Sequence, residues 1–309
     1  MNNMGNKLAS LGQVCKYLAG VAEKKGVEIY TGFSVDELLY DEDGKIVGAK
    51  TKDTGVNHHG NKLANFQLGT TIEAKITILA EGTRGSLTKT LIEKKNLDAD
   101  KHEQIYSLGV KELWKVEDGL IEEGQVYHTA GYPLRDGDEF CGGFIYGLSY
   151  NRVVLGLVVG LDYKDPTFDI HGAMQVWKQH PFVSKILAGG SIIEFGAKTL
   201  PEGGYNSIPK FYGDGFIIVG DGAGMLATAS LKGVHLSVQS GINAAKSVAT
   251  ALIKDDVSEE SLSSVQKYFD NSRLYKELYP VRNFRQSFSS GMISGALRFC
   301  VQLITKVHV

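Results

Sequence analysis

A strand of large apolar residues that runs directly into a glycine cluster and then into a long helix is the feature that most constrains this chain. The strand spans residues 216–219, and the run Gly-Asp-Gly-Ala-Gly follows at 220–224. Apolar residues at helical spacing from Val234 onward predict the helix. Glycines let a ligand approach backbone N–H groups, and a carboxylate beside them can accept hydroxyl groups of a ribityl chain. The segment predicts a flavin-binding turn or, alternatively, a turn in which Asp221 caps the helix.

A second strand ends in the same manner earlier in the chain. The apolar run at 76–79 leads into Ala-Glu-Gly-Thr-Arg-Gly at 80–85, and a helix is predicted at 86–94. Many α/β strands end in glycine, so this run says little by itself. The two runs together, with a β-rich stretch between them, are typical of flavoproteins of the two-dinucleotide-binding type.

A glycine pair inside an apolar strand is a third candidate. The run Cys-Gly-Gly-Phe at 141–144 leaves bare backbone on which a flat ring could pack and hydrogen-bond. From the residues alone, a β-bulge is the favoured explanation of the pair.

Lys232 follows the flavin turn and is a fourth candidate. Its cation could stabilise a reduced, anionic flavin ring, or it could be a solvated residue at the start of a helix. His235, three residues further on, is interpreted as a structural histidine.

Periodicity and turn residues predict the remaining elements. The expected helices span 8–25, 171–180, a short stretch from Pro181 and about 258–273. The expected strands span 27–30, 35–40, 45–51, 70–79 and 191–199, with further β runs and no helix between 104 and 160. Residues 52–66 are expected to form a loop. This order predicts an α/β (α+β) fold in which a cofactor domain is interrupted by an antiparallel β unit.

Composition excludes several classes of function. The chain has 43% hydrophobic and 22% charged residues, which is ordinary globular usage, and its net charge of −2 gives no reason to expect nucleic acid. The three cysteines lie far apart in the sequence and the eight histidines show no ligand spacing, so no metal site is expected. No residue is expected to act as a nucleophile or other catalytic group.

The tail from 286 to 309 is apolar but interrupted by polar and charged residues. Leu297, Phe299 and Val301 are interleaved with Arg298 and Gln302. The run is too broken for a membrane span. It predicts either a helix that lies in a bilayer interface, with its cations at the headgroups, or a core helix.

Several longer strings carry a resemblance to a known family. They are Gly-Val-Lys-Glu-Leu-Trp at 109–114, His-Thr-Ala-Gly-Tyr-Pro-Leu at 128–134, Gly-Leu-Val-Val-Gly-Leu-Asp-Tyr at 156–163 and Glu-Gly-Gly-Tyr-Asn-Ser-Ile-Pro-Lys at 202–210. Through them the chain strongly resembles electron-transfer flavoprotein–ubiquinone oxidoreductase over nearly its whole length. The resemblance implies an electron-transferring-flavoprotein dehydrogenase that uses FAD, electron-transfer flavoprotein as donor, ubiquinone as acceptor and a membrane surface. It implies the matrix face of the mitochondrial inner membrane or the cytoplasmic face of a bacterial inner membrane.

The resemblance also implies a domain division and a set of contacts. The division is 1–100 for part of the FAD domain, 101–200 for the β-rich quinone-binding domain, 201–255 for the returning FAD segment and 256–309 for the membrane-associated tail. The FAD contacts would be Gly82, Arg84, Gly85, Gly220, Asp221, Gly222, Gly224, Met225, Lys232 and Gly233. The quinone contacts would be Gly142, Gly143 and Phe144.

The chain also departs from the family's pattern. Cys141, Asp221 and Ala227 stand where the family usually has Tyr, often Cys and often Asn, respectively. The N-terminal Gly-x-Gly-x-x-Gly unit and the cysteine quartet of the four-iron four-sulfur cluster are not in this sequence, so an internal fragment is expected, with the cluster confined to the intact protein. The alternatives are a flavoprotein of the geranylgeranyl-reductase or Fix type, and a non-catalytic remnant.

Overall fold

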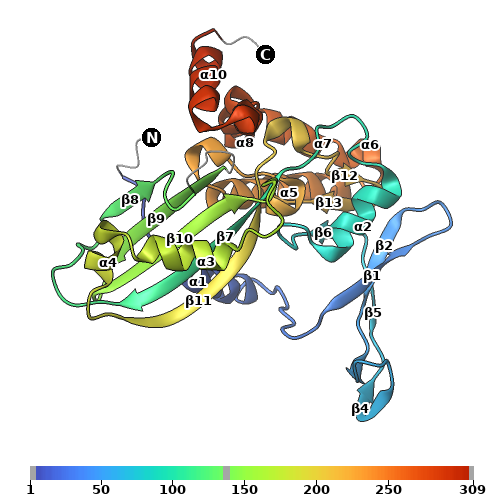
Figure 1. Ribbon diagram of the computed structural model, residues 1–309. Helices are drawn as coiled ribbons and strands as arrows, with labels where there is room; N and C mark the ends of the chain where they lie inside the picture. The colour runs from blue at the N-terminus through green and yellow to red at the C-terminus, as the bar shows by residue number, and fades with distance from the viewer. Residues whose placement is uncertain (1–4, 135–139, 306–309) are drawn as a thin grey trace.

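The computed structural model describes residues 5–134 and 140–305 (Figure 1). Its largest sheet, in the described part of the chain, is antiparallel with five strands in the order β11-β7-β10-β9-β8. The strands are β7 (Tyr106–Lys115), β8 (Val126–Thr129), β9 (Cys141–Leu148), β10 (Arg152–Gly160) and β11 (Ser191–Pro201). The expected antiparallel β unit is therefore confirmed.

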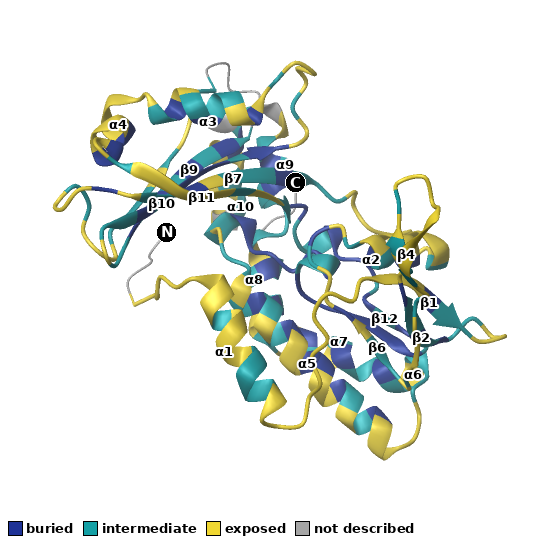
Figure 2. Cartoon of the chain, turned by 90° about the horizontal axis from the view of Figure 1, so that it is seen from below, coloured by how far each residue is buried: buried dark blue, intermediate teal, exposed yellow. Residues whose placement is uncertain are grey.

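Two helices cover one face of this sheet and not the other (Figure 2). These are α3 (Ile170–Lys178) and α4 (Pro181–Leu187), and both confirm the helices expected there. Burial alternates strictly along β9, because successive side chains of a strand point to opposite faces. Ile145, Leu155 and Leu157 pack with Met174 and Trp177 under the helices. The other face of the sheet looks toward the rest of the molecule.

A second core surrounds a short parallel pair of strands. β6 (Thr77–Leu79) lies beside β13 (Phe216–Ile218), which also pairs with β12 (Tyr212–Gly213). All three residues of β13 are buried, as expected for a parallel strand covered on both faces. The helices of this region are α2 (Ser86–Lys95), α5 (Val234–Ile253), α6 (Glu259–Leu262), α7 (Ser264–Asp270) and α8 (Arg273–Leu278). Ser258 caps α6 as the N-cap residue, but the single helix expected from it is broken at Ser263.

Two expectations for the first third of the chain are wrong. Residues 27–30 form no strand, because they lie exposed with no neighbouring strand to pair with. The stretch 52–66, expected to be a loop, contains a two-stranded hairpin of β3 (Thr54–Val56) and β4 (Lys62–Gln67). Its side chains are mostly exposed, polar and apolar alike, so the alternation that reveals a half-buried strand is missing. The expected hairpin of β1 (Val35–Tyr40) and β2 (Ile46–Thr51) is confirmed, with β5 (Thr71–Glu73) added at its edge.

The first and last helices expose apolar side chains. α1 (Leu11–Glu23) begins after Ser10, whose side chain caps it, and none of its residues is buried. The tail forms the short helix α9 (Phe284–Ser287) and then α10 (Met292–Thr305), with Leu297, Val301 and Ile304 exposed. Within 5–134 and 140–305 no helix is long and apolar enough to cross a bilayer. Residues 306–309 of the tail lie outside the described residues.

Candidate functional site

The two glycine turns meet at one edge of the parallel strand pair. Leu79 at the end of β6 is in register with Ile218 of β13, and the Val219 N–H donates to the Leu79 carbonyl over 3.0 Å. Parallel strands end at the same edge of a sheet, so the turn at 80–85 and the turn at 220–224 lie side by side. A Cβ built on Gly222 would be 3.5 Å from the carbonyl oxygen of Gly82.

Backbone conformation explains three of the glycines in these turns. Gly82, Gly220 and Gly224 have φ angles of +76°, +62° and +76°, a region that side chains disfavour. A Cβ on Gly82 would meet nothing within 4 Å, so open space lies beside this turn. The Gly220 N–H donates to the hydroxyl of Ser240 on α5 over 2.9 Å, which ties the second turn to the helix. Together the turns form a cradle of bare backbone.

Glu81 has a structural role that the sequence analysis missed. Its carboxylate accepts the N–H and the hydroxyl of Thr88, each over 2.7 Å, and so caps the beginning of α2. Gly85, the residue before that helix, packs against the Glu81 side chain, where a Cβ would clash. Arg84 has a φ of +53°, and its guanidinium lies 5.3 Å from the centre of the Tyr106 ring at the start of β7. The first turn therefore reaches the large sheet.

Asp221 does not cap the helix, so the capping alternative is wrong. It lies in a 3-10 turn, η2 (Gly220–Ala223), whereas the residue before α5 is Gly233. The Ser237 hydroxyl donates to the Asp221 carboxylate over 3.4 Å. Burial raises the pKa of Asp221, and the Ser237 hydrogen bond and the charge of Lys198 on β11 oppose this rise. A carboxylate can accept about four hydrogen bonds, so capacity remains for ligand hydroxyls.

The loop that follows the second turn divides its residues between core and surface. Met225 is 1% exposed and packs in the hydrophobic core, so its side chain is turned away from the cradle. Ala227 and Lys232 close the loop by exchanging backbone hydrogen bonds of 3.0 and 3.3 Å. Lys232 is half-buried and lines a cavity of about 410 Å³ between this loop and strands β8 and β9. It is therefore not a fully solvated residue.

His235 is the structural histidine that its position suggested. Its Nε2 lies 2.7 Å from a carboxylate oxygen of Glu277 on α8, so the interaction joins α5 to α8. No group of three or more His, Cys, Asp or Glu residues able to hold a metal occurs in the described ranges.

The glycine pair of β9 lies in regular sheet, so the β-bulge explanation is wrong. The pairings of β9 with β10 and with β8 run without a register shift. Gly143 faces the covering helices, where a Cβ would be 2.5 Å from Cζ2 of Trp177. Gly142 and Phe144 face the opposite side of the sheet. The pair therefore serves two different faces of the sheet.

The open face of the sheet carries further glycines that the sequence analysis missed. Register places Gly142 in line with Gly109 and Lys198, and Phe144 in line with Gly156, Lys111 and Gly196. The Phe144 ring lies across Gly156, where a Cβ would be 2.5 Å from two ring atoms. The sequence could have shown this, because within each β run these glycines stand at alternate positions that lie on one face of the sheet. They reduce the number of side chains on this face, which also carries Val158, Lys111, Lys198 and the Phe144 ring.

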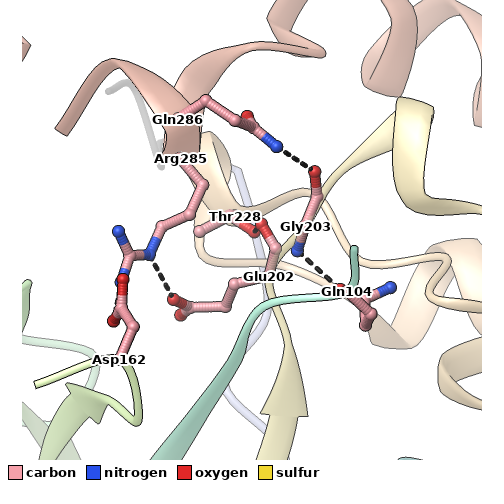
Figure 3. A network of polar contacts seen from close by, with 7 residues as sticks. All are labelled: Gln104, Asp162, Glu202, Gly203, Thr228, Arg285 and Gln286. Carbon is pink, nitrogen blue, oxygen red and sulfur yellow. Dashed lines mark hydrogen bonds and ion pairs between the residues drawn. The ribbon is translucent and has the colours of Figure 1, made fainter. Parts of the chain in front are cut away.

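A polar network fixes the sheet to the second turn and to the tail (Figure 3). Arg285 of α9 is 3% exposed; it pairs with Asp162, and its Nε lies 3.4 Å from a carboxylate oxygen of Glu202 at the end of the sheet. Gln104 accepts the Gly203 N–H over 2.6 Å. The Gln286 amide donates to the Gly203 carbonyl over 2.8 Å. The Thr228 hydroxyl donates to the Glu202 carbonyl over 3.5 Å, which links the loop after the second glycine turn to this network.

Comparison with known proteins places this architecture. A family model described as "ETF-QO, ubiquinone-binding" matches residues 106–200, the segment that forms the sheet and its helices. A probable mitochondrial electron transfer flavoprotein-ubiquinone oxidoreductase of Schizosaccharomyces pombe is 42% identical over 94% of this chain and 46% of its own length. The human mitochondrial and Pseudomonas aeruginosa proteins of that name are 40% and 41% identical, over 93% and 92% of this chain and 47% and 52% of their own lengths.

Solved structures of flavoproteins share the fold at low sequence identity. A geranylgeranyl bacteriochlorophyll reductase-like protein of Thermoplasma acidophilum superposes with a TM-score of 0.71 at 14% identity, over 97% of this chain and 76% of that chain. A flavoprotein/dehydrogenase of Cytophaga hutchinsonii reaches 0.60 at 16% identity, over 90% and 61%. The fold class expected from the sequence, a partial FAD-binding fold with an inserted antiparallel sheet, is confirmed. The chain belongs to the electron transfer flavoprotein-ubiquinone oxidoreductase family and spans about half the length of the curated relatives it matches.

Proposed function

We propose that this chain carries the flavin- and quinone-binding part of an enzyme that passes electrons from reduced electron-transfer flavoprotein through FAD to ubiquinone. One observation carries the proposal: the two glycine turns lie side by side and next to the sheet that the ubiquinone-binding family model matches. The Arg84 guanidinium lies over the Tyr106 ring, and the charge of Lys198 on β11 is close enough to act on Asp221.

The residues of the cradle fit FAD. Open space beside Gly82 gives room for the phosphate and ribityl chain, and Asp221 has acceptor capacity for ribityl hydroxyls. FAD would supply the chemistry of accepting and donating electrons. Lys232 would place its cation near the ring and stabilise negative charge there. Gly85, Gly224 and Gly233 would shape the turns, Arg84 would lie at their edge, and Met225 would contribute its backbone.

For the quinone, we propose contact at Gly142 and Phe144 on the open face of β9. Gly142 leaves backbone accessible, since a Cβ there would meet the Thr129 carbonyl at 3.2 Å and nothing else within 4 Å. Phe144 offers a ring for stacking. Gly143 contributes indirectly, because its lack of a side chain lets Trp177 support the strand from behind.

The remaining parts of the proposal concern the cluster, the membrane and the domain division. Cys15, Cys141 and Cys300 lie on α1, β9 and α10, so the described residues do not fit a four-iron four-sulfur cluster, and we route no step of this chain through one. The exposed apolar residues of α10 support binding to a membrane surface. We place that surface at the matrix face of the mitochondrial inner membrane, or at the cytoplasmic face of a bacterial one. The proposed division is 1–100, 101–200, 201–255 and 256–309.

FAD binding by the full chain is the first test. We expect equilibrium dialysis followed by flavin absorbance to show a stoichiometric complex, and photoreduced complex to be reoxidised by a short-chain ubiquinone under anaerobic conditions. Gly222→Val should weaken FAD binding by about tenfold or more, equivalent to ~1.4 kcal/mol, because the added side chain would crowd Gly82, Ile218 and Thr88 and change the shape of the two turns. Its matched control is Gly241→Val on α5, where a Cβ meets nothing within 4 Å. The proposal would be contradicted if the wild-type chain bound no FAD, or if short-chain ubiquinone did not reoxidise its reduced flavin.

A further inference from the structure

His128 and Tyr146 form a hydrogen-bonded pair on the open face of the sheet. His128 is on β8 and Tyr146 on β9, and register places both side chains on the same face as Phe144. The Nε2 of His128 is 3.2 Å from the Tyr146 hydroxyl. Their rings are nearly perpendicular, with centroids 5.8 Å apart. The Phe144 ring lies against Tyr146 at 4.9 Å, so the pair continues the surface proposed for the quinone.

The pair also lines the cavity of about 410 Å³. Lys232, from the loop after the second glycine turn, lines the same cavity. This volume lies within the range of about 300–1,000 Å³ typical of small-molecule sites. The charged groups that face the pair come from each neighbouring segment: Glu123 from the loop before β8, Lys232 from the loop before α5, and Lys7 from the N-terminal segment. His128 is exposed, so its imidazole can exchange protons with solvent.

The surroundings of the pair adjust both groups for proton transfer. Partial desolvation of the ring and the positive charge of Lys232 lower the pKa of His128, so its imidazolium gives up a proton more readily than a fully solvated histidine does. Burial raises the pKa of Tyr146, so its hydroxyl stays protonated and can act as a donor. An imidazole and a phenol in hydrogen-bond contact can pass a proton between them.

We propose that Tyr146 and His128 deliver the protons that convert a bound quinone to quinol, an inference that rests on the proposed function. The Tyr146 O–H bond breaks as the new O–H bond forms at the quinone oxygen, and the His128 Nε2–H proton then restores the Tyr146 hydroxyl. Solvent reprotonates His128. The quinone takes two electrons from the reduced flavin, which is oxidised, and the relay runs twice to supply two protons. His128 and Tyr146 are thus catalytic residues for quinone reduction.

A comparison of two electron acceptors tests the relay. Full-length chain loaded with FAD and photoreduced is mixed with short-chain ubiquinone, which needs protons, or with ferrocenium ion, which takes one electron and no proton. We expect His128→Gln to slow reoxidation by ubiquinone roughly 100-fold, the lower part of the range for general acid catalysis, and Tyr146→Phe to slow it as well. Reoxidation by ferrocenium should keep its rate. His171→Gln, on helix α3 across the sheet, is the matched control and should change neither rate.

The pH profile adds a readout that a structural role would not move. In the wild type the ubiquinone rate should fall as pH rises through the His128 pKa, and His128→Gln should lose this dependence. A His128→Gln chain that reduces ubiquinone at the wild-type rate would overturn the relay, as would equal slowing with both acceptors. If the wild type fails to reduce ubiquinone at all, the proposed function fails. If the wild type reduces it and His128→Gln matches it, only the relay fails.

Histidine NMR on the chain without FAD gives a test that does not depend on turnover. Adding short-chain ubiquinone should shift the ring signals of His128 and leave those of His171 in place. Lys232→Gln should raise the His128 pKa, because it removes a nearby positive charge. Quinone binding, measured separately by equilibrium dialysis, with no change at His128 would place the quinone elsewhere and overturn the inference.

Discussion

Gly143 and the Trp177 ring occupy adjoining space: a Cβ added to Gly143 would lie 2.5 Å from Cζ2 of Trp177. Trp177 is 2% exposed and is the largest side chain in the core between the sheet and α3. Gly142, the neighbouring residue, faces the other side of the sheet. The two adjacent glycines look like one motif but have different roles. Gly143 makes room for the Trp177 ring in the core, and Gly142 leaves the other face of the strand uncovered.

This relationship predicts opposite effects for the same substitution at the two glycines. Gly143→Val should destabilise the protein by about 1–3 kcal/mol, the usual cost of overpacking a core, and lose quinone reduction together with stability. Gly142→Val should keep the free energy of unfolding near that of the wild type but reduce quinone reduction, because its side chain covers the proposed contact surface. Urea unfolding and quinone turnover, measured on both variants, separate the two effects. Equal stability of the two variants would contradict the packing role of Gly143.

The buried pair of Glu202 and Arg285 predicts a pH dependence of stability. Both side chains are 3% exposed, and burial raises the pKa of Glu202, with Ser107 and Arg285 opposing this rise. Between its ordinary pKa, about 4.3, and its higher folded pKa, the native state binds more protons than the unfolded state. The free energy of unfolding should therefore fall as pH rises through this window.

Glu202→Gln tests that dependence, since it removes the titrating group and keeps the side-chain volume. Melting temperatures of the variant should change less with pH than those of the wild type across this window. Arg285→Met should instead cost about 3–5 kcal/mol at neutral pH, because it leaves the Glu202 carboxylate buried without its cation. An unchanged pH slope in Glu202→Gln would show that another group is responsible.

A second buried ion pair joins α3 to the sheet and predicts a measurable coupling. Lys178 contacts both carboxylate oxygens of Glu112 at 2.8 Å, and the Trp114 indole N–H donates to the same carboxylate over 2.7 Å. Side-chain exposure is 12% for Lys178 and 8% for Glu112. Lys178→Met should cost about 3 kcal/mol, and the double variant with Glu112→Gln should cost less than the sum of the single changes. Additive losses in urea unfolding would mean that the pair does not act as a unit.

The exposed stripe of α10 predicts binding to lipid surfaces. Leu297 and Ile304 are 65% and 82% exposed, one above the other on one face of the helix. Changing both to Gln should reduce cosedimentation with anionic vesicles and leave the melting temperature unchanged, because neither side chain is packed in the core. Phe195→Gln on β11, where the ring is 85% exposed, is the matched control and should not alter vesicle binding. A similar loss of vesicle binding in both variants would indicate nonspecific binding through exposed apolar side chains rather than docking through α10.

His235 is predicted to contribute little to the stability of the protein. Its pair with Glu277 is about one third exposed, so solvent screens it strongly. His235→Ala should cost no more than about 1 kcal/mol in urea unfolding and should not change FAD affinity in equilibrium dialysis. A large loss of FAD affinity would give His235 a role at the cofactor.

The sequence by itself determined most of the order of the elements and the two glycine turns. The run at 216–224 is readable because a fully buried parallel strand must be continuously apolar and because a chain turn at Gly220 or Gly224 requires positive φ. The sequence strings that carry the resemblance to the family can likewise be recognised from neighbouring residues alone. The strict burial pattern of β9 and the helix from Pro181 are of this kind, since both follow from neighbours in the chain.

Only the tertiary structure decided which residues share a face. Gly142 and Gly143 are adjacent in sequence, but the pleat of the strand separates them, and what each one faces depends on α3 and on the flavin turns. The alternative in which Asp221 caps the helix is excluded only once the loop to Gly233 is placed. The His128–Tyr146 pair, the Glu202–Arg285 pair and the glycines on one face of the sheet join residues that lie far apart in the sequence. Local propensity carries no information on such pairings, because they arise from strand register and from the packing of one region of the chain against another.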